Sequence, residues 1–529
     1  MTSLAPSTPS PSMAVAAPDT RGLSRLGTGP AIVAWIAALK FTLHFATASL
    51  YGFFIDEIYF LACGQHLAWG YADMPPLTAF QAWLTRLLFG DSPWSIRLFP
   101  SLAGAGLVLL TGAIVRQLGG GRFAQALAAL AVLVAPLNLA VCSYLSMNSI
   151  EPLAWMGCAF VMIKILKSGD TRLWIWFGAI AGIGLLNKHT MLVFGFSLVV
   201  GLLLTAGRRL MFNRWFLIAG AIAFLIFLPN LAWEIQHHFP HLELLANIRR
   251  NGRDISANPF WFLVWNVILM NPAAAPLWIA GLVSLLAGSL KRFRALGLAY
   301  VIAYVVLIAS NGRVYYLGPA YSMLFAAGAI ATERLLASDK TRWTRVAYAA
   351  IIVVVGAAIA PTVVPLLPPD LYLRYTEITH IRQPKFENRG TMAMPQFFAD
   401  RFGWPEMVAT VAKVYNSLPP DERARTAIFG NDFGQSGAID YYGPRYGLPR
   451  SIGGHLSNWY WGPRNYTGES ILVLGDRRDV LESKFEDVKA VAEIGHPCAM
   501  RQEHFTLFLC HKPRGWTLAS AWPKLKNWN

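Results

Sequence analysis

Long apolar stretches, separated by short polar connections, fill the first two thirds of the chain. About 20 apolar residues are enough to cross a bilayer as a helix. Candidate stretches lie at residues 30–53, 97–115, 123–142, 151–166, 173–187, 190–206, 214–232, 259–289, 295–310, 315–332 and 345–364. The pattern predicts a polytopic α-helical membrane protein with about eleven transmembrane helices. The weakest part is 173–206, where Asn187-Lys188-His189 interrupts two rather short stretches.

Basic residues distinguish one set of connections from the other. Lys and Arg gather in the connections at 116–122, 164–172, 208–214, 291–294 and 334–345. These connections share one side of the membrane with the N-terminus, which carries Arg21 and Arg25. Such an excess of Lys and Arg is typical of cytoplasmic loops. An odd number of spans then places residues 365–529 on the periplasmic side of a bacterial inner membrane.

Two long connections face the outer side in this topology. The first, residues 54–96, mixes apolar positions with Asp56, Glu57 and Asp73. Scattered acidic residues favour helices that lie in the membrane interface over another span. The second, residues 233–258, contains histidines and the basic run Arg249-Arg250-Asn251-Gly252-Arg253.

The sequence changes character after the last apolar stretch. Short apolar runs lie at 427–429, 471–474 and 505–509, and helical patterns lie at 405–418 and 479–493. Strands that alternate with helices predict a small α/β domain. The chain is therefore divided into a disordered cytoplasmic tail (1–27), a transmembrane domain (28–365) and a periplasmic α/β domain (366–529).

The composition agrees with a membrane protein. Hydrophobic residues make up 55% of the chain and charged residues 14%, and the mean hydropathy is +0.42. That is too little charge for a soluble globule of this length. The formal net charge of +16 is explained by cytoplasmic loops and anionic lipid headgroups, so we expect no nucleic-acid partner. Five cysteines are too few for a disulfide framework, and Cys498 and Cys510 either pair or stay free.

An acidic pair, Asp56-Glu57, follows the first apolar stretch directly. Carboxylates are unfavourable close to hydrocarbon, so an acidic pair at this depth is a candidate functional site. One carboxylate could act as a general base on a hydroxyl or amine, while the other orients it or holds a metal. The alternative is a solvated helix end, and position alone does not decide between the two.

Several cations lie on the predicted outer side, against the general trend. Lys188 and Arg313 fall within or beside apolar stretches, which favours a specific anionic ligand such as a lipid phosphate. For the run from Arg249 to Arg253, a phosphate ligand and contact with lipid headgroups are equally good explanations.

A divalent metal ion is a further hypothesis for the outer loops. His237 and His238 could supply imidazole nitrogens, with Asp73 or Glu57 supplying a carboxylate oxygen. A histidine pair in such a loop is more often simply polar, so both interpretations stay open.

Several motifs, taken in order, resemble those of the membrane-embedded glycosyltransferases of the C superfamily (GT-C). The resemblance is closest to the polyprenyl-phosphate-dependent set that includes protein O-mannosyltransferases and the lipid A aminoarabinose transferase. The motifs are Asp56-Glu57, Gly70-Tyr71-Ala72-Asp73-Met74-Pro75-Pro76-Leu77, Leu185-Leu186-Asn187-Lys188-His189-Thr190, His237-His238-Phe239-Pro240, Tyr315-Tyr316-Leu317-Gly318-Pro319-Ala320-Tyr321, Gly430-Asn431-Asp432-Phe433-Gly434-Gln435-Ser436-Gly437-Ala438 and His455-Leu456-Ser457-Asn458-Trp459-Tyr460-Trp461-Gly462-Pro463. The ordered set is more specific than any single motif.

The resemblance implies a GT-C fold and a reaction. Asp56 would be the catalytic base and Glu57 its partner, in a cavity at the outer membrane surface. A sugar on polyprenyl phosphate would be transferred by direct displacement at the anomeric carbon, with inversion, and the lipid phosphate would leave. Cations that neutralise this phosphate would contribute more than acid catalysis. The sequence does not specify the sugar or the acceptor, which could be lipopolysaccharide, another glycolipid, a polysaccharide or a protein.

The same resemblance implies binding roles. Lys188 and Arg313 would hold the phosphate. The other candidate substrate-binding residues are Asp73, Arg249, Tyr315 and Tyr316. Some relatives hold a metal between an acidic residue of the first outer loop and a histidine of the second, where this chain has Asp73 and His237 or His238.

Two questions stay open at this point. Asn148 stands where many relatives carry Asp, so either Glu151 compensates or the acceptor differs. The main alternative to sugar transfer is a lipid-linked sugar flippase or another polytopic transporter. The sequence shows no pair of similar halves with matched broken spans, as inverted-repeat transporters have. A polymerase or ligase that uses the same lipid carriers shares these features and is harder to separate.

Overall fold

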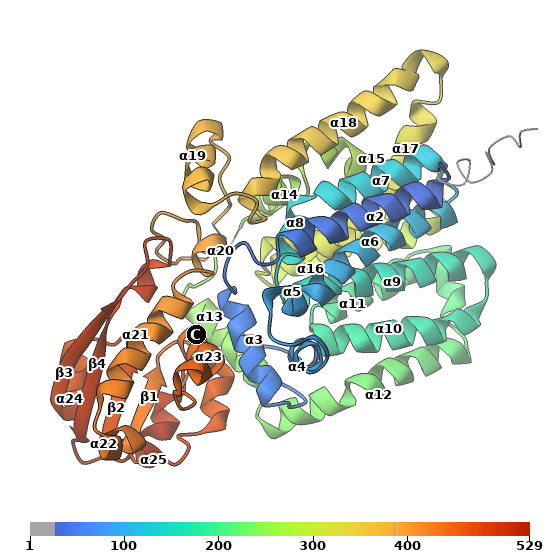
Figure 1. The fold of residues 1–529 in the computed structure, drawn as a ribbon. Helices are drawn as coiled ribbons and strands as arrows, with labels where there is room; N and C mark the ends of the chain where they lie inside the picture. The colour runs from blue at the N-terminus through green and yellow to red at the C-terminus, as the bar shows by residue number, and fades with distance from the viewer. Residues whose placement is uncertain (1–26, 256, 386, 529) are drawn as a thin grey trace, which may run out of the picture.

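The computed structural model describes residues 27–255, 257–385 and 387–528 (Figure 1). A bundle of helices carries a smaller domain with a β-sheet at one end. The two parts meet around α3 (Ile55–Gln65), α13 (Pro240–Arg250) and α23 (Phe433–Tyr442). The predicted disordered tail, 1–27, lies outside the described residues except for its last residue.

Every predicted apolar stretch is helical in the bundle. Its helices are α2 (Gly29–Ala46), α6 (Leu98–Gln117), α7 (Arg122–Val134), α8 (Pro136–Val141), α9 (Met147–Ser168), α10 (Trp174–Asn187), α11 (Met191–Leu203), α12 (Arg214–Gln236), α14 (Pro259–Leu269), α15 (Ala275–Leu286), α16 (Arg294–Ala309), α17 (Tyr321–Leu335) and α18 (Arg342–Ile359). Within the described ranges, 7 helices are long and apolar enough to cross a membrane, or 8 if the bent pair α14–α15 is one span. The multi-pass membrane class is confirmed, whereas the number of about eleven spans is not.

One apolar stretch is broken between α7 and α8. Helix α7 ends at Val134, and Pro136 begins α8 because proline cannot donate the hydrogen bond that would continue the first helix. The buried ammonium group of Lys40, on α2, lies 3.4 Å from the carbonyl oxygen of Leu133 and 3.3 Å from that of Asn138. Lys40 therefore satisfies carbonyl groups near the break, which is a structural reason for a charge inside the bundle.

A second break lies between α14 and α15, which meet at an angle of 104°. Asn271 occupies the corner at φ 74°, in the left-handed region that Asn adopts more readily than most residues. Its side-chain amide donates to the carbonyl oxygen of Ile352 at 2.9 Å and fixes the corner against α18. The end of α14 contacts α8 as a result.

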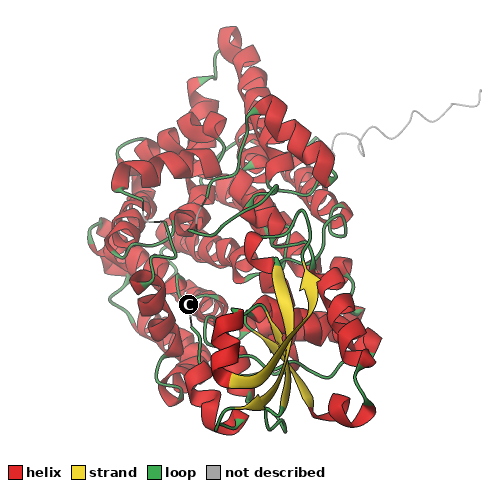
Figure 2. Cartoon of the chain, turned by 90° about the vertical axis from the view of Figure 1, so that its left-hand side faces the viewer, coloured by secondary structure: helices red, strands yellow, loops and turns green. Residues whose placement is uncertain are grey.

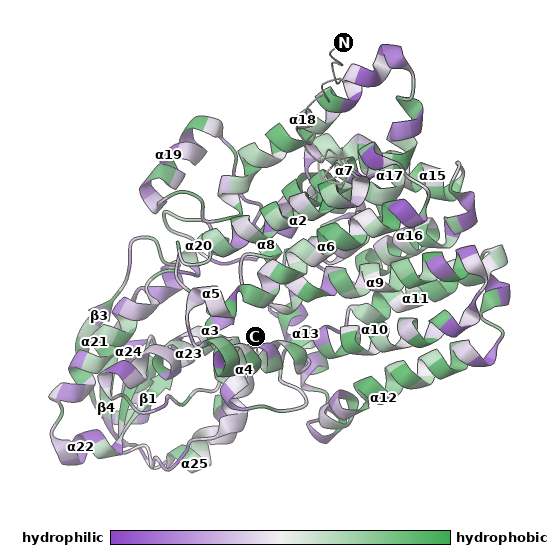
Figure 3. Ribbon diagram, turned by 45° about the vertical axis from the view of Figure 1, so that its right-hand side comes forward, coloured by the Kyte–Doolittle hydropathy of each residue, from purple (hydrophilic) through white to green (hydrophobic). Residues whose placement is uncertain are grey.

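The predicted basic connections meet at the end of the bundle away from the sheet domain (Figure 3). Lys167 donates to the carbonyl oxygen of Gln117 at 2.8 Å, and Arg292 donates to that of Leu166 at 2.9 Å. Arg345 donates to the carbonyl oxygen of Glu333 at 2.9 Å. The segregation of these groups to one end agrees with the topology predicted from the sequence.

The predicted first outer loop, residues 54–96, forms three helices between the bundle and the sheet domain. These are α3, α4 (Leu77–Phe89) and α5 (Pro93–Ile96). Helix α4 exposes apolar side chains, with Leu87 64% and Leu88 58% exposed. Such a face suits a helix that lies in the membrane interface, as predicted for this loop.

The C-terminal domain contains a mixed four-stranded sheet (Figure 2). Its elements are α19 (Pro369–Thr379), α20 (Gln396–Ala399), α21 (Trp404–Ser417), α22 (Pro420–Arg425), β1 (Thr426–Gly430), α23, β2 (Ser470–Leu474), α24 (Arg478–Lys484), β3 (Phe485–Ile494), β4 (Phe505–Pro513) and α25 (Leu518–Ala521). The strand order is β1-β2-β4-β3, with β1 and β2 parallel and the other pairs antiparallel. Cys498 and Cys510 are both free.

The predicted helix at 479–493 is wrong over most of its length. Only Arg478–Lys484 is helical, and Phe485–Ile494 is strand β3. Strand β3 pairs with β4 and has a register shift between Ala490 and Ala492. Ala, Glu and Lys favour a helix locally, but pairing with the exposed edge of β4 outweighs this weak preference.

Helix α23 of the C-terminal domain packs directly on α3. A Cβ atom on Gly437 would lie 2.8 Å from Cγ2 of Ile58, and one on Gly434 would overlap the side chain of Ile55. The two glycines therefore permit an approach that larger residues would prevent. Because Ile55 precedes Asp56, the C-terminal domain contacts the segment that carries the predicted catalytic pair.

Candidate functional site

A cavity of about 340 Å³ lies where the bundle meets the C-terminal domain. Its polar lining includes Asp56, Asn148, Arg253, Arg313, Glu387 and Arg389. Its apolar lining includes Pro136, Leu137, Ala140, Val141, Leu269 and Val363. The apolar residues come from α8, from the end of α14 and from the turn that follows α18, so the two helix breaks shape this wall. A cavity with one apolar and one charged side suits an amphipathic ligand.

Asp56 reaches the cavity from the first turn of α3. Burial raises the pKa of its carboxyl group to about 7, and the negative charges of Asp73 and Glu387 contribute to the increase. Arg253 and Arg389 oppose this shift. A carboxyl group with a pKa near neutrality can accept a proton from a ligand and release it again.

Glu57 lies away from the cavity, in a fully buried ion pair with Arg97. The guanidinium group donates to both carboxylate oxygens, Nε to Oε1 at 2.9 Å and Nη2 to Oε2 at 2.6 Å. The backbone N–H groups of Phe54 and Leu145 donate to the same carboxylate, each at 2.8 Å. The structure therefore gives Glu57 a positioning role next to Asp56 and no contact with a ligand in the cavity.

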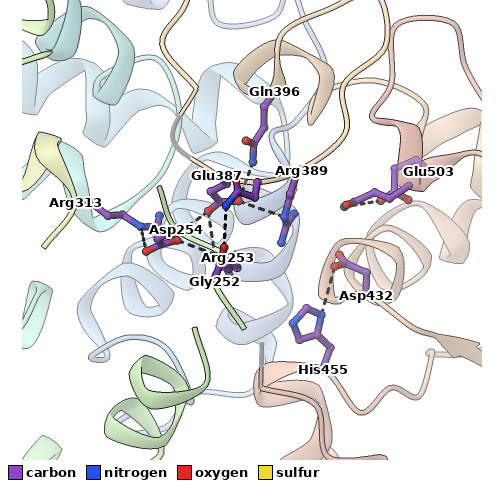
Figure 4. A network of polar contacts seen from close by, with 12 residues as sticks. Gly252, Arg253, Asp254, Arg313, Glu387, Arg389, Gln396, Asp432, His455 and Glu503 are labelled. Carbon is purple, nitrogen blue, oxygen red and sulfur yellow. Dashed lines mark hydrogen bonds and ion pairs between the residues drawn. The ribbon is translucent and has the colours of Figure 1, made fainter. Parts of the chain in front are cut away.

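Three arginines surround two carboxylates at the polar side of the cavity (Figure 4). Arg313 donates to Asp254 at 2.7 and 2.8 Å and to Glu387 at 2.9 Å. Glu387 also pairs with Arg253 at 3.3 Å and with Arg389 at 3.2 Å. Burial alone would raise the pKa of Glu387, but the three arginines lower it to about 2. One positive charge is left over in this cluster, which favours an anionic ligand.

Glu387 and Arg389 come from a segment of the C-terminal domain far from the other residues in sequence. Asp254 and Glu387 form an isolated antiparallel bridge. Asn388 strengthens it, because its backbone N–H donates to Arg253 O at 2.9 Å and its side chain donates to Gly252 O at 2.9 Å. The C-terminal domain thereby reaches back over the second outer loop and contributes to the cavity.

Lys188 lies beside the cavity but is already paired. Its ammonium group donates to Asn148 Oδ1 and Glu151 Oε2, both at 2.8 Å. It also lies 4.1 Å from the centre of the Tyr316 ring. Asn148 lines the cavity, whereas the carboxylate of Glu151 neutralises Lys188. Glu151 thus supplies the negative charge that Asn148 lacks.

The remaining predicted substrate-binding residues divide into two groups. Arg313 and Tyr315 line the cavity, and Arg313 Nη1 donates to the Tyr315 hydroxyl at 3.1 Å. Arg249 is exposed and donates to the carbonyl oxygen of Ser310 at 2.9 Å, outside the cavity lining. Of the predicted basic run, Arg253 lines the cavity, and it lies beyond the end of α13.

The predicted metal ligands are not brought together. His237 stacks on Trp233, with ring centres 4.1 Å apart. Nδ1 of His237 also contacts the carbonyl oxygen of Trp233. His238 lies in the turn after α12 at φ 60°, and Asp73 accepts a hydrogen bond from the Tyr59 hydroxyl at 2.7 Å. No group of three His, Cys, Asp or Glu side chains within the described ranges is arranged to hold a metal. The predicted ligands, as the structure places them, do not fit a metal ion.

Comparisons with known proteins identify the fold of the chain. Residues 73–233 match the model of the dolichyl-phosphate-mannose-protein mannosyltransferase family. The crystal structure of ArnT from Cupriavidus metallidurans bound to undecaprenyl phosphate is similar over 93% of this chain and 98% of that chain, with 14% identity and a TM-score of 0.62. The chain has the GT-C fold. The resemblance predicted from the motifs is therefore confirmed at the level of the fold.

Two further comparisons complete these findings. The apo structure of the same ArnT covers 90% of this GT-C chain and 97% of its own, with 14% identity and a TM-score of 0.60. The archaeal oligosaccharyltransferase AglB from Archaeoglobus fulgidus, in complex with an inhibitory peptide and a dolichol-phosphate, has 12% identity and a TM-score of 0.48 over 80% of this chain and 64% of that one. A search of the curated proteins gives no match.

The buried ion pair between Glu57 and Arg97, next to Asp56, gives a direct test of the positioning role of Glu57. Glu57→Ala leaves the buried charge of Arg97 without its partner, so we expect the free energy of unfolding to fall by about 3–5 kcal/mol. Thermal unfolding of the purified protein in detergent, followed by tryptophan fluorescence, measures the change. Asp479→Ala is the matched control, because its pair with Arg477 is exposed and screened by solvent. Equal Tm values for the two variants would contradict the role of Glu57.

Proposed function

We propose that this GT-C protein is an inverting glycosyltransferase that moves a sugar from a polyprenyl-phosphate carrier to a lipid, polysaccharide or protein acceptor. The observation that carries the proposal is one cavity that joins the Asp56 carboxylate, three arginines and an apolar wall. The sugar donor matches the two sides of this cavity, because it has a long apolar chain attached to an anionic phosphate. The periplasmic face of a bacterial inner membrane, predicted from the distribution of charge, is part of this proposal.

The carrier fits the apolar side of the cavity. The wall is formed by α8, Leu269 and Val363. Leu269 ends one half of the bent pair α14–α15 and Val363 follows a helix long enough to cross a membrane, so an isoprenoid chain would reach the wall from the lipid phase. The phosphate would then lie among Arg253, Arg313 and Arg389, where it would compete with Asp254 and Glu387 for charge-assisted hydrogen bonds. The similarity in fold to an ArnT bound to undecaprenyl phosphate supports this choice of carrier.

The reaction follows from the charges in the cavity. The acceptor hydroxyl gives its proton to the Asp56 carboxylate, and its oxygen forms a bond with the anomeric carbon. The bond between that carbon and the phosphate oxygen breaks, and the electron pair leaves with the phosphate. The arginines stabilise the charge that develops on the leaving phosphate. A single displacement inverts the configuration of the anomeric carbon.

Replacement of Asp56 tests the function most directly. We expect Asp56→Asn to lower sugar transfer by about 10²–10⁴-fold, the usual contribution of a general base, without loss of abundance or Tm. The assay gives purified protein in lipid nanodiscs a labelled polyprenyl-phosphate sugar and a membrane glycolipid extract. Asp91→Asn, at an exposed pair with Arg86, is the control. Movement of the donor across the bilayer without turnover would instead support the transport alternative.

The pH dependence follows from the environment of Asp56. Because only its carboxylate form can accept a proton, kcat/KM should rise with pH through about 7, the pKa that burial and nearby negative charges give it. Asp73→Asn removes one of those charges while keeping the size of the side chain, so the midpoint should move to lower pH. A midpoint that stays in place or moves up would show that another group controls the profile.

We expect an arginine that lines the cavity to contribute to the affinity for the carrier, and an arginine outside the lining to contribute nothing. Arg389→Gln removes a charge that lines the cavity, and we expect the Kd for undecaprenyl phosphate to rise about 10-fold or more, as for loss of one charged hydrogen bond. Arg249→Gln, outside the cavity lining, should leave the Kd unchanged. Calorimetric titration in nanodiscs measures both. An equal effect of the two variants would indicate general attraction to lipid phosphate.

A further inference from the structure

Asp400 lines the cavity, yet the steps above give it no role. It follows α20 directly, and its backbone N–H donates to Gln396 O at 3.0 Å. Its carbonyl oxygen accepts from the backbone N–H of Ile55 at 3.0 Å and from Trp404 Nε1 at 3.1 Å. Because Ile55 precedes Asp56, the bond to Ile55 fixes the backbone of Asp400 beside the proposed base.

The two carboxyl oxygens of Asp400 differ in their surroundings. The residue is 2% exposed, and Oδ1 is fully buried with no hydrogen-bond partner among the residues that the structure describes. Oδ2 has no partner within those ranges either, but it is not fully buried. Since Asp400 lines the cavity, Oδ2 is the oxygen through which the carboxyl group reaches it.

These surroundings favour the neutral form of the Asp400 carboxyl group. A carboxylate with an unpaired buried oxygen is strongly unfavourable, whereas the neutral acid loses less on burial. Burial accordingly raises the pKa of Asp400 well above its usual range; Arg389 opposes this shift, and the negative charge of Asp56 adds to it. Asp400 is thus a carboxylic acid that can donate a hydrogen bond into the cavity.

Asp400 is close to both groups that the proposed reaction needs. Its carboxyl group interacts electrostatically with Arg389 and with Asp56, and all three residues line one cavity. In the proposed reaction Arg389 holds the phosphate, and Asp56 takes the proton of the acceptor. The sugar that is transferred is bonded to that phosphate and is attacked by that acceptor. It therefore lies between Arg389 and Asp56, beside Asp400.

We propose that Asp400 binds the sugar of the donor, with its neutral carboxyl group donating a hydrogen bond from Oδ2 to a sugar hydroxyl. The inference rests on the proposed function, because it places the sugar from the positions of the phosphate and the base. It also selects a class of sugar. The ammonium group of an amino sugar would need an ionised carboxylate, which would leave the charged Oδ1 of Asp400 buried without a partner. A neutral sugar with a free hydroxyl at this point fits Asp400 better.

Two substitutions distinguish a neutral acid from a carboxylate at this position. Asp400→Asn keeps the shape of the side chain, and its Nδ2 can donate in place of the O–H group. Asp400→Ala removes the donor. Because Oδ1 has no partner within the described ranges, neither variant should lower the Tm. Asp421→Ala, at an exposed residue of the same domain outside the cavity lining, is the control.

The measurement is calorimetric titration of the full chain in lipid nanodiscs. The probes are undecaprenyl-phosphoglucose, undecaprenyl-phosphogalactose, undecaprenyl-phosphomannose and, without a sugar, undecaprenyl phosphate. For the neutral glycosyl carrier that binds the wild type most tightly, Asp400→Ala should raise the Kd about 10-fold, as for loss of one hydrogen bond, and Asp400→Asn should keep it within about 2-fold. Undecaprenyl phosphate should bind every variant with the wild-type Kd.

The outcomes separate this inference from the proposed function. The titrations need no acceptor and no turnover, so they report on Asp400 even if Asp56→Asn retains activity and the reaction has been assigned wrongly. An equal rise in the Kd for undecaprenyl phosphate would place Asp400 at the phosphate and overturn the inference. It would also be overturned if Asn weakened binding as much as Ala, or if no neutral carrier bound the wild type. Tighter binding of undecaprenyl-phosphoglucosamine than of every neutral carrier would assign an ionised Asp400 instead. A fall in Tm common to both variants would assign Asp400 to folding and contradict a role in sugar binding.

Discussion

The buried ion pair between Glu57 and Arg97 is the interaction on which the rest of the site depends. Arg97 stands at the start of α6 and donates to the backbone carbonyls of Ala48 and, at 2.8 Å, Gly52, in the connection between α2 and α3. Glu57 accepts from the backbone of Leu145, in the turn between α8 and α9. Four segments of the bundle are thus joined at one carboxylate. Successive residues of a helix point about 100° apart, so fixing Glu57 on one side directs Asp56 to the other.

The cavity combines groups that differ in how firmly they are held. The apolar wall is built from helix ends that Lys40 and Asn271 keep in place by hydrogen bonds to backbone carbonyls. The arginines form their ion pairs with the carboxylates of Asp254 and Glu387, and an anion can replace these carboxylates. A phosphate would therefore exchange partners in the polar part without disturbing the wall. Burial of such a network is acceptable because the two carboxylates offset two of the three guanidinium charges before the ligand arrives.

The sequence allowed the local features of this molecule to be predicted and concealed the distant ones. The place of Asp56 at a functional cavity was predictable because Asp56 follows an apolar stretch directly. Glu57 could not be separated from it, since its partner Arg97 lies 40 residues away in another element. Lys188 looked like a free outer cation for the same reason: Glu151, on the preceding helix, pairs with it only in three dimensions. The sequence predicts a helix over most of strand β3 because the sequence shows the composition of this segment and not its pairing with β4.

The bridge between Asp254 and Glu387 limits how freely the C-terminal domain can be exchanged. A fold with a membrane part and a separate outer domain invites the view that the two are interchangeable modules. Here a strand-like pairing across that boundary supplies Glu387 and Arg389 to the cavity, and α23 rests on the helix that carries Asp56. A chimera that joins this bundle to a related outer domain after residue 365 would lose both contributions at once. The cavity is therefore complete only when both parts of the chain are present.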